Sequence, residues 1–216
     1  MGQPFATQAV ADREFFTDRE REVGRVLEVM RTRDRLVLYG ERRMGKSSVI
    51  ARAAERVRSE GGVVLMADAW TITELDDLNR ALMESVPRDW LVGDRLSALL
   101  RALRSVVLVT ADGDGRPVVQ FTGTAMPDSR PGERLSRILR GLDRVAADHE
   151  RPVVVVIDEF QKLEEVEGGS GGLLRQLVQE TPNLAYVFAG SIVGLVLELL
   201  GPKGPFHAMD RLEVQG

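Results

Sequence analysis

The segment LVLYGERRMGKSSVI, residues 36–50, constrains the fold more than any other part of this 216-residue chain. Its first residues form a short continuous apolar run, which is typical of a buried strand. From Val49 to Val57 apolar residues recur at helical spacing. The loop between these two runs contains glycines at positions 40 and 45, followed at once by a lysine and a serine. The sequence therefore predicts a strand, a glycine-containing loop and an amphipathic helix in immediate succession.

In that setting the spacing Gly-x-x-x-x-Gly-Lys-Ser is that of a phosphate-binding loop, the Walker A motif. The glycines permit backbone angles that turn successive N–H groups toward an anion, and the helix adds its positive N-terminal end. We expect the side chain of Lys46 to reach the β- and γ-phosphates of ATP and the Ser47 hydroxyl to ligate Mg²⁺. The residues predicted to bind nucleotide are Gly40, Glu41, Arg42, Arg43, Met44, Gly45, Lys46, Ser47 and Ser48.

Lysine is rare in this chain, which strengthens the prediction for position 46. Of the 29 basic residues only three are lysines, at positions 46, 162 and 203. A chain that uses arginine nearly everywhere therefore has a local reason for a lysine in this loop. Arg42 and Arg43 either contact phosphates or a neighbouring subunit, or face solvent.

A second motif supplies the carboxylates that a phosphate-binding loop requires. The stretch PVVVVIDEFQKL, residues 152–163, is an apolar strand pattern that ends in Asp158 and Glu159. We expect Asp158 to orient Mg²⁺ and Glu159 to polarise the attacking water as general base. This is the pattern of a Walker B motif, and the adjacent Asp-Glu pair favours ATP hydrolysis over phosphoryl transfer to another substrate.

A third apolar run, LAYVFAG at 184–190, is followed by Ser191. In P-loop ATPases with an extra strand between the Walker A and Walker B strands, a polar residue at the tip of that strand senses the γ-phosphate. Ser191, or the backbone around Gly190, is the candidate for this role. An ordinary helix N-cap explains the same serine equally well.

The remaining pattern alternates strands with helices, which predicts an α/β fold. We expect further strands at 63–67 and 211–215, and helices near 74–85, 90–104, 135–145, 173–180 and 192–200. A hairpin is predicted at 105–121 with its turn at 112–115, and GGSGG at 168–172 is predicted to be a flexible loop. Thr17 and Glu20 have capping-box spacing before an N-terminal helix.

The predicted architecture is the three-layer α/β/α sandwich of P-loop NTPases. Its sheet should be mostly parallel and five-stranded, with the extra strand between the Walker A and Walker B strands. The chain shows no internal repeat or domain-scale linker, so residues 1–216 are expected to form one ATPase domain. Its parts are an adenine-side segment (1–34), the Walker A unit (35–60), a hairpin insertion (105–131), the Walker B segment (152–163) and the sensor strand and helix (184–200).

Composition narrows the alternatives. The chain contains no cysteine, which excludes disulfides, thiol catalysis and thiolate metal sites. Its net charge is −4, so charge does not support nucleic acid as a partner. No signal peptide is visible, and no apolar run approaches the roughly 18 residues of a membrane span. We therefore expect a cytoplasmic protein without a membrane partner.

Together the segments FFTDREREVGRVLEVM, LVLYGERRMGKSSVI, VVVVIDEFQKL and YVFAGSIVGLV resemble archaeal-type ATPases, within the STAND and AAA+-like P-loop ATPases. The resemblance spans about residues 14–200. It implies that Phe16, Arg19 and Glu20 lie beside the adenine, although an ordinary capped helix explains each of these side chains equally well. Relatives usually continue into a helical lid and an effector domain, so this chain is expected to be either a fragment or a core that acts alone.

Three functions remain open. The first is an Mg²⁺-dependent ATPase, slow in isolation, that converts ATP to ADP and phosphate as the motor or switch core of a larger assembly. The second is a regulatory switch that binds ATP and rarely hydrolyses it. The third is a DNA-associated accessory ATPase. The resemblance implies a protein partner or self-association that donates an arginine to the site.

Overall fold

The computed structural model describes residues 19–87, 107–111, 113–115, 117–121, 130–166, 170–191, 193–202, 204 and 206–215. At its centre is a five-stranded sheet in the order β2-β5-β6-β1-β7, in which every neighbouring pair is parallel. The strands are β1 (Arg35–Tyr39), β2 (Val63–Asp68), β5 (Val153–Asp158), β6 (Leu184–Gly190) and β7 (Asp210–Glu213). The predicted α/β fold is confirmed, with β6 between the strands of the two Walker motifs.

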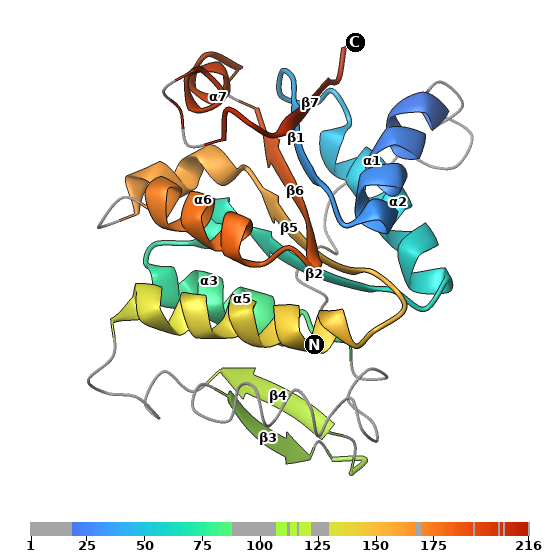
Figure 1. Ribbon diagram of the computed structural model, residues 1–216, viewed down its shortest axis with the longest axis vertical. Coiled ribbons are helices and arrows are strands. Elements are labelled where there is room, and N and C mark those ends of the chain that lie inside the picture. The colour runs from blue at the N-terminus through green and yellow to red at the C-terminus, as the bar shows by residue number, and fades with distance from the viewer. Residues whose placement is uncertain are drawn as a thin grey trace.

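Helices cover both faces of this sheet (Figure 1). One face carries α1 (Glu20–Thr32) and α2 (Lys46–Ser59), and the other carries α3 (Leu75–Glu84), α5 (Pro131–Ala147) and α6 (Ser170–Glu180). Because side chains alternate along a strand, Leu36 and Leu38 of β1 pack toward α1 and α2, whereas Val37 packs into the core of the opposite face. The sheet thus separates two hydrophobic cores and fixes the direction of each strand end.

Three short helical segments lie near the strand ends. The 3₁₀ turns η2 (Ala69–Thr71) and η5 (Phe160–Glu165) follow β2 and β5, and helix α7 (Val193–Leu199) follows β6. The predicted hairpin is present as an antiparallel pair, β3 (Val107–Ala111) and β4 (Pro117–Phe121), and β4 contacts α3. The helix predicted at 90–104 lies outside the described residues.

Two local predictions are wrong. Helix α1 begins at Glu20 with Arg19 as its N-cap and without a side-chain cap, so Glu20 is not the third residue of a capping box. Thr17 itself lies outside the described residues. Helix α6 begins at Ser170, so part of the predicted GGSGG loop is helical. Burial of Leu174 and Leu177 against the core stabilises this helix by more than the roughly 1 kcal/mol that each glycine costs.

Candidate functional site

Four loops meet at one edge of the sheet because β1, β2, β5 and β6 all run parallel. The phosphate loop (residues 40–48) follows β1 and enters α2, and η2 follows β2. The turn that we call the β5 turn (residues 158–161) leads into η5, and Ser191 follows β6. Open parallel sheets bind ligands at the carboxyl ends of their strands. The sequence-predicted Walker A, Walker B and sensor residues are therefore brought to the same edge.

The backbone of the phosphate loop requires both of its glycines. Gly45, the N-cap of α2, has φ 82° and ψ 15°, a left-handed conformation that is strained for other residues. At Gly40 a Cβ atom would lie only 2.3 Å from the carbonyl oxygen of Val214, which follows β7. Arg43 also has a positive φ, 67°. The loop is therefore shaped by local backbone geometry and by close packing against the last strand.

Lys46 is held inside its own loop. Its Nζ donates to the carbonyl oxygens of Gly40 at 2.9 Å and Glu41 at 2.8 Å, and the residue is only 5% exposed. Burial lowers the pKa of Lys46, while the carboxylates of Glu159 and Asp158 oppose that shift. The ammonium therefore lies where an anion entering the loop would take over its hydrogen bonds.

The predicted metal residues are in direct contact. The Ser47 hydroxyl donates to Asp158 Oδ2 at 2.7 Å, and the N–H of Glu159 donates to Asp158 Oδ1 at 2.9 Å. Burial raises the pKa of Asp158, and the carboxylates of Glu159 and Asp68 add to the rise. Paired hydroxyl and carboxylate oxygens suit Mg²⁺, which keeps few protein ligands and completes its shell with water and phosphate oxygens.

No cluster of three or more His, Asp or Glu side chains suited to a metal ion occurs among the described residues. A cation bound by Ser47 and Asp158 would therefore take its remaining ligands from nucleotide and water rather than from further side chains.

Glu159 is held by two donors. Ser191 Oγ and Gln161 Nε2 each donate to its Oε2 at 2.6 Å. The residue has φ 50° and ψ 37°, so the chain turns sharply after β5 and brings the carboxylate back to the edge of the sheet. Glu159 and Ser191, which were predicted separately as base and sensor, thus lie together, and the structure adds Gln161 to them.

A family model for the AAA ATPase domain matches residues 16–189. The chain belongs to this family. The expected resemblance to archaeal-type P-loop ATPases is thereby confirmed, and the chain is an ATP-binding P-loop ATPase domain. No curated protein matches the chain.

Solved structures share the fold of this AAA ATPase domain. A Walker-type ATPase of Pyrococcus abyssi has a TM-score of 0.55 at 19% identity, over 94% of this chain and 54% of that one. Aeropyrum pernix ORC2 has a TM-score of 0.58 at 12% identity, over 92% of this chain and 48% of that one. ORC1 of the same organism, in complex with DNA, has a TM-score of 0.56 at 18% identity, over 92% of this chain and 45% of that one. The chain therefore spans about half the length of these proteins.

Two residues of this edge, Asp68 at the end of β2 and Trp70 in η2, belong to no sequence motif. Asp68 lies opposite Asp158 in the sheet, and its Oδ1 accepts from the N–H of Trp70 at 3.0 Å. Burial raises the pKa of Asp68, and Glu159 adds to the rise. Trp70 is 49% exposed, with the Arg42 guanidinium 4.9 Å and the Lys162 ammonium 4.5 Å from its ring centroid. The indole thus connects the phosphate loop to η5.

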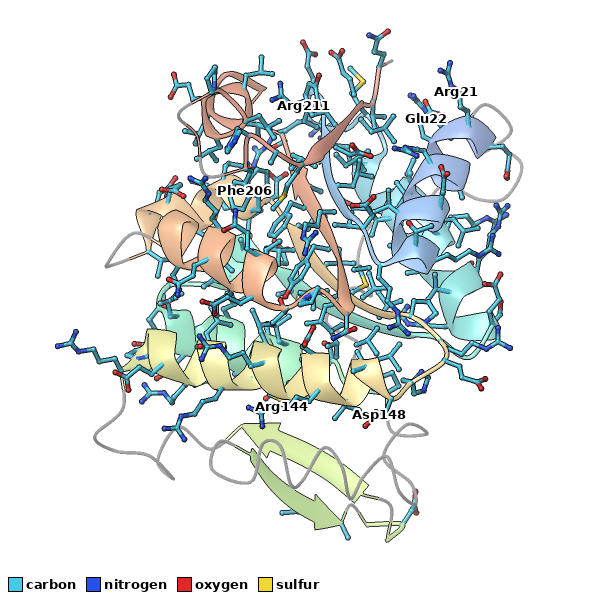
Figure 2. The ribbon with its side chains drawn as sticks, viewed as in Figure 1. Arg21, Glu22, Arg144, Asp148, Phe206 and Arg211 are labelled. Carbon is cyan, nitrogen blue, oxygen red and sulfur yellow. The ribbon has the colours of Figure 1, made fainter. Side chains whose placement is uncertain are left out.

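An aromatic cluster in the core holds the β5 turn in place. Phe160, the first residue of η5, packs edge-on against Phe188 of β6 and Phe206, with ring centroids 5.6 Å and 5.3 Å away. Figure 2 labels Phe206 among the side chains between α7 and the sheet. Because Phe160 is buried in this cluster, its position is fixed, and this restricts the backbone of its neighbours Glu159 and Gln161.

The adenine-side prediction is not tested by the structure. Phe16 lies outside the described residues. Arg19 donates to Glu22 at 3.1 Å, and Glu20 accepts from Arg56 of α2 at 2.9 Å. These contacts tie the start of α1 to neighbouring helical turns, and the roles of Arg19 and Glu20 toward adenine remain predictions. Among the described residues, no helix is both long enough and apolar enough for a membrane span.

Proposed function

We propose that this AAA ATPase domain hydrolyses ATP to ADP and phosphate in an Mg²⁺-dependent reaction. The observation that carries the proposal is the position of Glu159. Glu159 is the residue after Asp158, which accepts a hydrogen bond from Ser47. The Glu159 carboxylate also lies near enough to Lys46 to influence the pKa of that lysine. A base beside a phosphate-binding lysine and a metal-binding pair is the arrangement that hydrolysis requires.

Binding is the task of the phosphate loop. The N-terminal N–H groups of α2 and the positive end of that helix attract the phosphates. Lys46 exchanges the carbonyl oxygens of Gly40 and Glu41 for phosphate oxygens, and its charge then has a partner in place of two neutral dipoles. The loop thus binds the triphosphate in a defined orientation.

Mg²⁺ would be held by Ser47 and Asp158, whose oxygens are 2.7 Å apart. When bound, the ion supplies positive charge to the β- and γ-phosphate oxygens. With the ion bound, the Ser47 hydroxyl would no longer donate to Asp158, and the positive charge would offset the desolvation that disfavours the Asp158 anion.

The chemical step is the in-line attack of water on the γ-phosphorus. Glu159 accepts a proton from that water as the new P–O bond forms, and the bond to the bridging oxygen breaks to release ADP. Ser191 lies beside Glu159 and would contact the γ-phosphate side of the site. Proton, phosphate and ADP account for all atoms of the reaction.

Single-turnover hydrolysis tests this proposal. The protein in excess over radiolabelled ATP should release phosphate with Mg²⁺ and release none after addition of EDTA, while filter binding reports bound nucleotide. Binding of ATP without release over many hours would instead support the regulatory switch. The same reaction with and without duplex DNA tests the DNA-associated alternative, which is suggested by the ORC1–DNA neighbour and opposed by a net charge of −4.

A further inference from the structure

We infer that Gln161 is a positioning residue for Glu159, holding one carboxylate oxygen so that the other faces the attacking water. This inference rests on the proposed hydrolysis. Gln161 Nε2 and Ser191 Oγ both donate to Oε2 of Glu159, each at 2.6 Å. Within the part of the chain that the structure describes, Oε1 of Glu159 accepts no hydrogen bond from the protein. The carboxylate is thus divided into a held oxygen and a free one.

Gln161 acts through Glu159 and not on the nucleotide. The residue is fully buried in η5. Its carbonyl Oε1 has no hydrogen-bond partner among the described residues, which is unfavourable for a buried polar atom. An apolar side chain of similar length would fill this space without that cost. The hydrogen bond to Glu159 therefore explains why an amide stands here.

The surrounding residues are shaped around this amide. A Cβ atom at Gly190 would lie 2.7 Å from Gln161 Oε1 and 2.6 Å from Val196 Cγ2. Glycine at the end of β6 therefore leaves the room that the glutamine side chain occupies. Phe160, the residue before it, is fixed in the aromatic cluster with Phe188 and Phe206. The side chain of Gln161 therefore has little conformational freedom, and its hydrogen bond restricts the Glu159 carboxylate in turn.

Two donors are needed because the backbone does not fix the side chain. Glu159 lies in a turn closed by the Lys162 N–H, which donates to its carbonyl oxygen at 2.9 Å. The side chain can still rotate about its own bonds. With Ser191 alone, the carboxylate keeps one hydrogen bond and turns about it. With both donors, its plane is defined, and a base must lie within hydrogen-bond reach of the proton that it accepts.

The substitution Gln161→Met tests the inference, since methionine preserves length and removes the donor. ATP affinity by calorimetry should stay within about twofold, whereas single-turnover hydrolysis should slow about tenfold or more, because a misplacement of about 1 Å can cost ~10²-fold. In a Glu159→Gln background the same change should have no further effect on the residual rate. The matched control is Gln176→Met, which removes a Gln–Glu hydrogen bond of 2.8 Å on the surface of α6.

Parental turnover in Gln161→Met would overturn the inference, and so would an equal loss in the Glu159→Gln background. Gln161→Leu, which also lacks the amide donor, decides the matter if the methionine variant does not fold. Failure of both variants to fold would identify a structural residue and also overturn the inference. If the parent protein does not hydrolyse ATP, or Glu159→Gln hydrolyses it at the parental rate, the proposed function fails instead.

Discussion

The phosphate loop and the β5 turn lie side by side, but they are prepared for a ligand in different ways. In the phosphate loop, Lys46 is bonded to its own carbonyl groups and Ser47 to Asp158, so nucleotide and metal must replace existing contacts. In the β5 turn, Glu159 is already held by Ser191 and Gln161, and the phosphates need not displace the buried Gln161. The difference suggests that binding rearranges one region, whereas chemistry uses a second region that is set beforehand.

The largest expected effect is a rise in turnover when an arginine is supplied to the β5 turn from outside the chain. Among the described residues no arginine donates to Glu159 or Asp158, and Arg211 is engaged with the carbonyl of Leu200 at 2.6 Å (Figure 2). An arginine from a second copy or a partner can raise the rate ~10³–10⁵-fold. Turnover per molecule should therefore increase with protein concentration or added partner in a steady-state assay.

Light scattering in the same samples supplies the control. Brisk turnover by a dilute, monomeric protein would mean that one chain contains a complete site, and the comparison would have to be redrawn.

The next effect separates chemistry from binding. Glu159→Gln keeps the shape of the side chain and removes its basicity, so hydrolysis should fall by ~10²–10⁴-fold while ATP still binds. Single-turnover release of phosphate and calorimetric binding report the two quantities. Hydrolysis close to the parental rate would contradict the assignment of Glu159 as base.

The converse change breaks the phosphate loop. Lys46→Ala removes the cation expected at the β- and γ-phosphates, and a charge-assisted contact of this kind contributes about 2–3 kcal/mol. The dissociation constant for ATP should rise by roughly 30- to 150-fold in calorimetry. The control is Arg140→Ala, which removes a cation of α5 that pairs with Glu180. An unchanged affinity in Lys46→Ala would refute the phosphate-binding loop.

A smaller effect concerns the residue that joins the two regions. Because burial raises the pKa of Asp158, its charge is unfavourable in the protein without metal. Asp158→Asn removes this unfavourable charge, so it should raise the free energy of unfolding at neutral pH, and it should abolish Mg²⁺-dependent hydrolysis. The raised pKa means that the native parent binds protons more readily than the unfolded chain. The lower stability of the parent relative to Asp158→Asn should therefore disappear as the pH falls through that pKa.

Asp77 provides a control of opposite sign. Burial alone would raise its pKa, but hydrogen bonds from Thr73 and from the backbone N–H of Glu74 hold the pKa below its ordinary value. Asp77→Asn should therefore lower stability at neutral pH, and more so than at acid pH. Chemical denaturation of both variants at neutral and acid pH measures the two changes in the free energy of unfolding. Changes of the same sign in both variants would contradict the electrostatic account.

The smallest effect tests the indole that connects the two regions. Trp70→Leu removes cation–π contacts with Arg42 and Lys162, and such contacts at exposed sites are worth ~0.5–1 kcal/mol. ATP affinity should weaken about two- to fivefold. Leu197→Ala, at the other exposed large apolar residue of the described chain, is the control and should leave affinity unchanged. Equal effects of both changes would argue against a specific role for the indole.

Local patterns in the sequence predicted most of the sheet and the core of the site. Four of the five strands end within one residue of the apolar run that predicted them, whereas β7 ends at Glu213, two residues before its predicted end. Spacing also predicted that Lys46, Ser47 and Asp158 belong to one site, and their roles remain predictions. The place of the extra strand between the Walker strands came from the resemblance to P-loop ATPases. The apolar runs and the Walker motifs depend on residues close in sequence, which is why a single chain predicts them.

The errors have a different origin. The start of α1 and the glycines of α6 were misjudged because tertiary packing outweighed local capping and propensity. Gln161 was missed because its contact with Glu159 depends on the left-handed turn at that residue. The position of Trp70 depends on β2 lying next to β5 in the sheet. Such contacts are set by topology, and no spacing rule in the sequence contains them.

The close contact between Val214 and Gly40 has a mechanical consequence. The Val214 N–H donates to the carbonyl of Tyr39 at 2.8 Å, and its own carbonyl lies against the first glycine of the phosphate loop. Tension on the strand that ends at Glu213 would therefore be transmitted through one residue to the loop that we propose binds ATP. A force applied at the C-terminal strand and the occupancy of the nucleotide site are thus expected to influence each other.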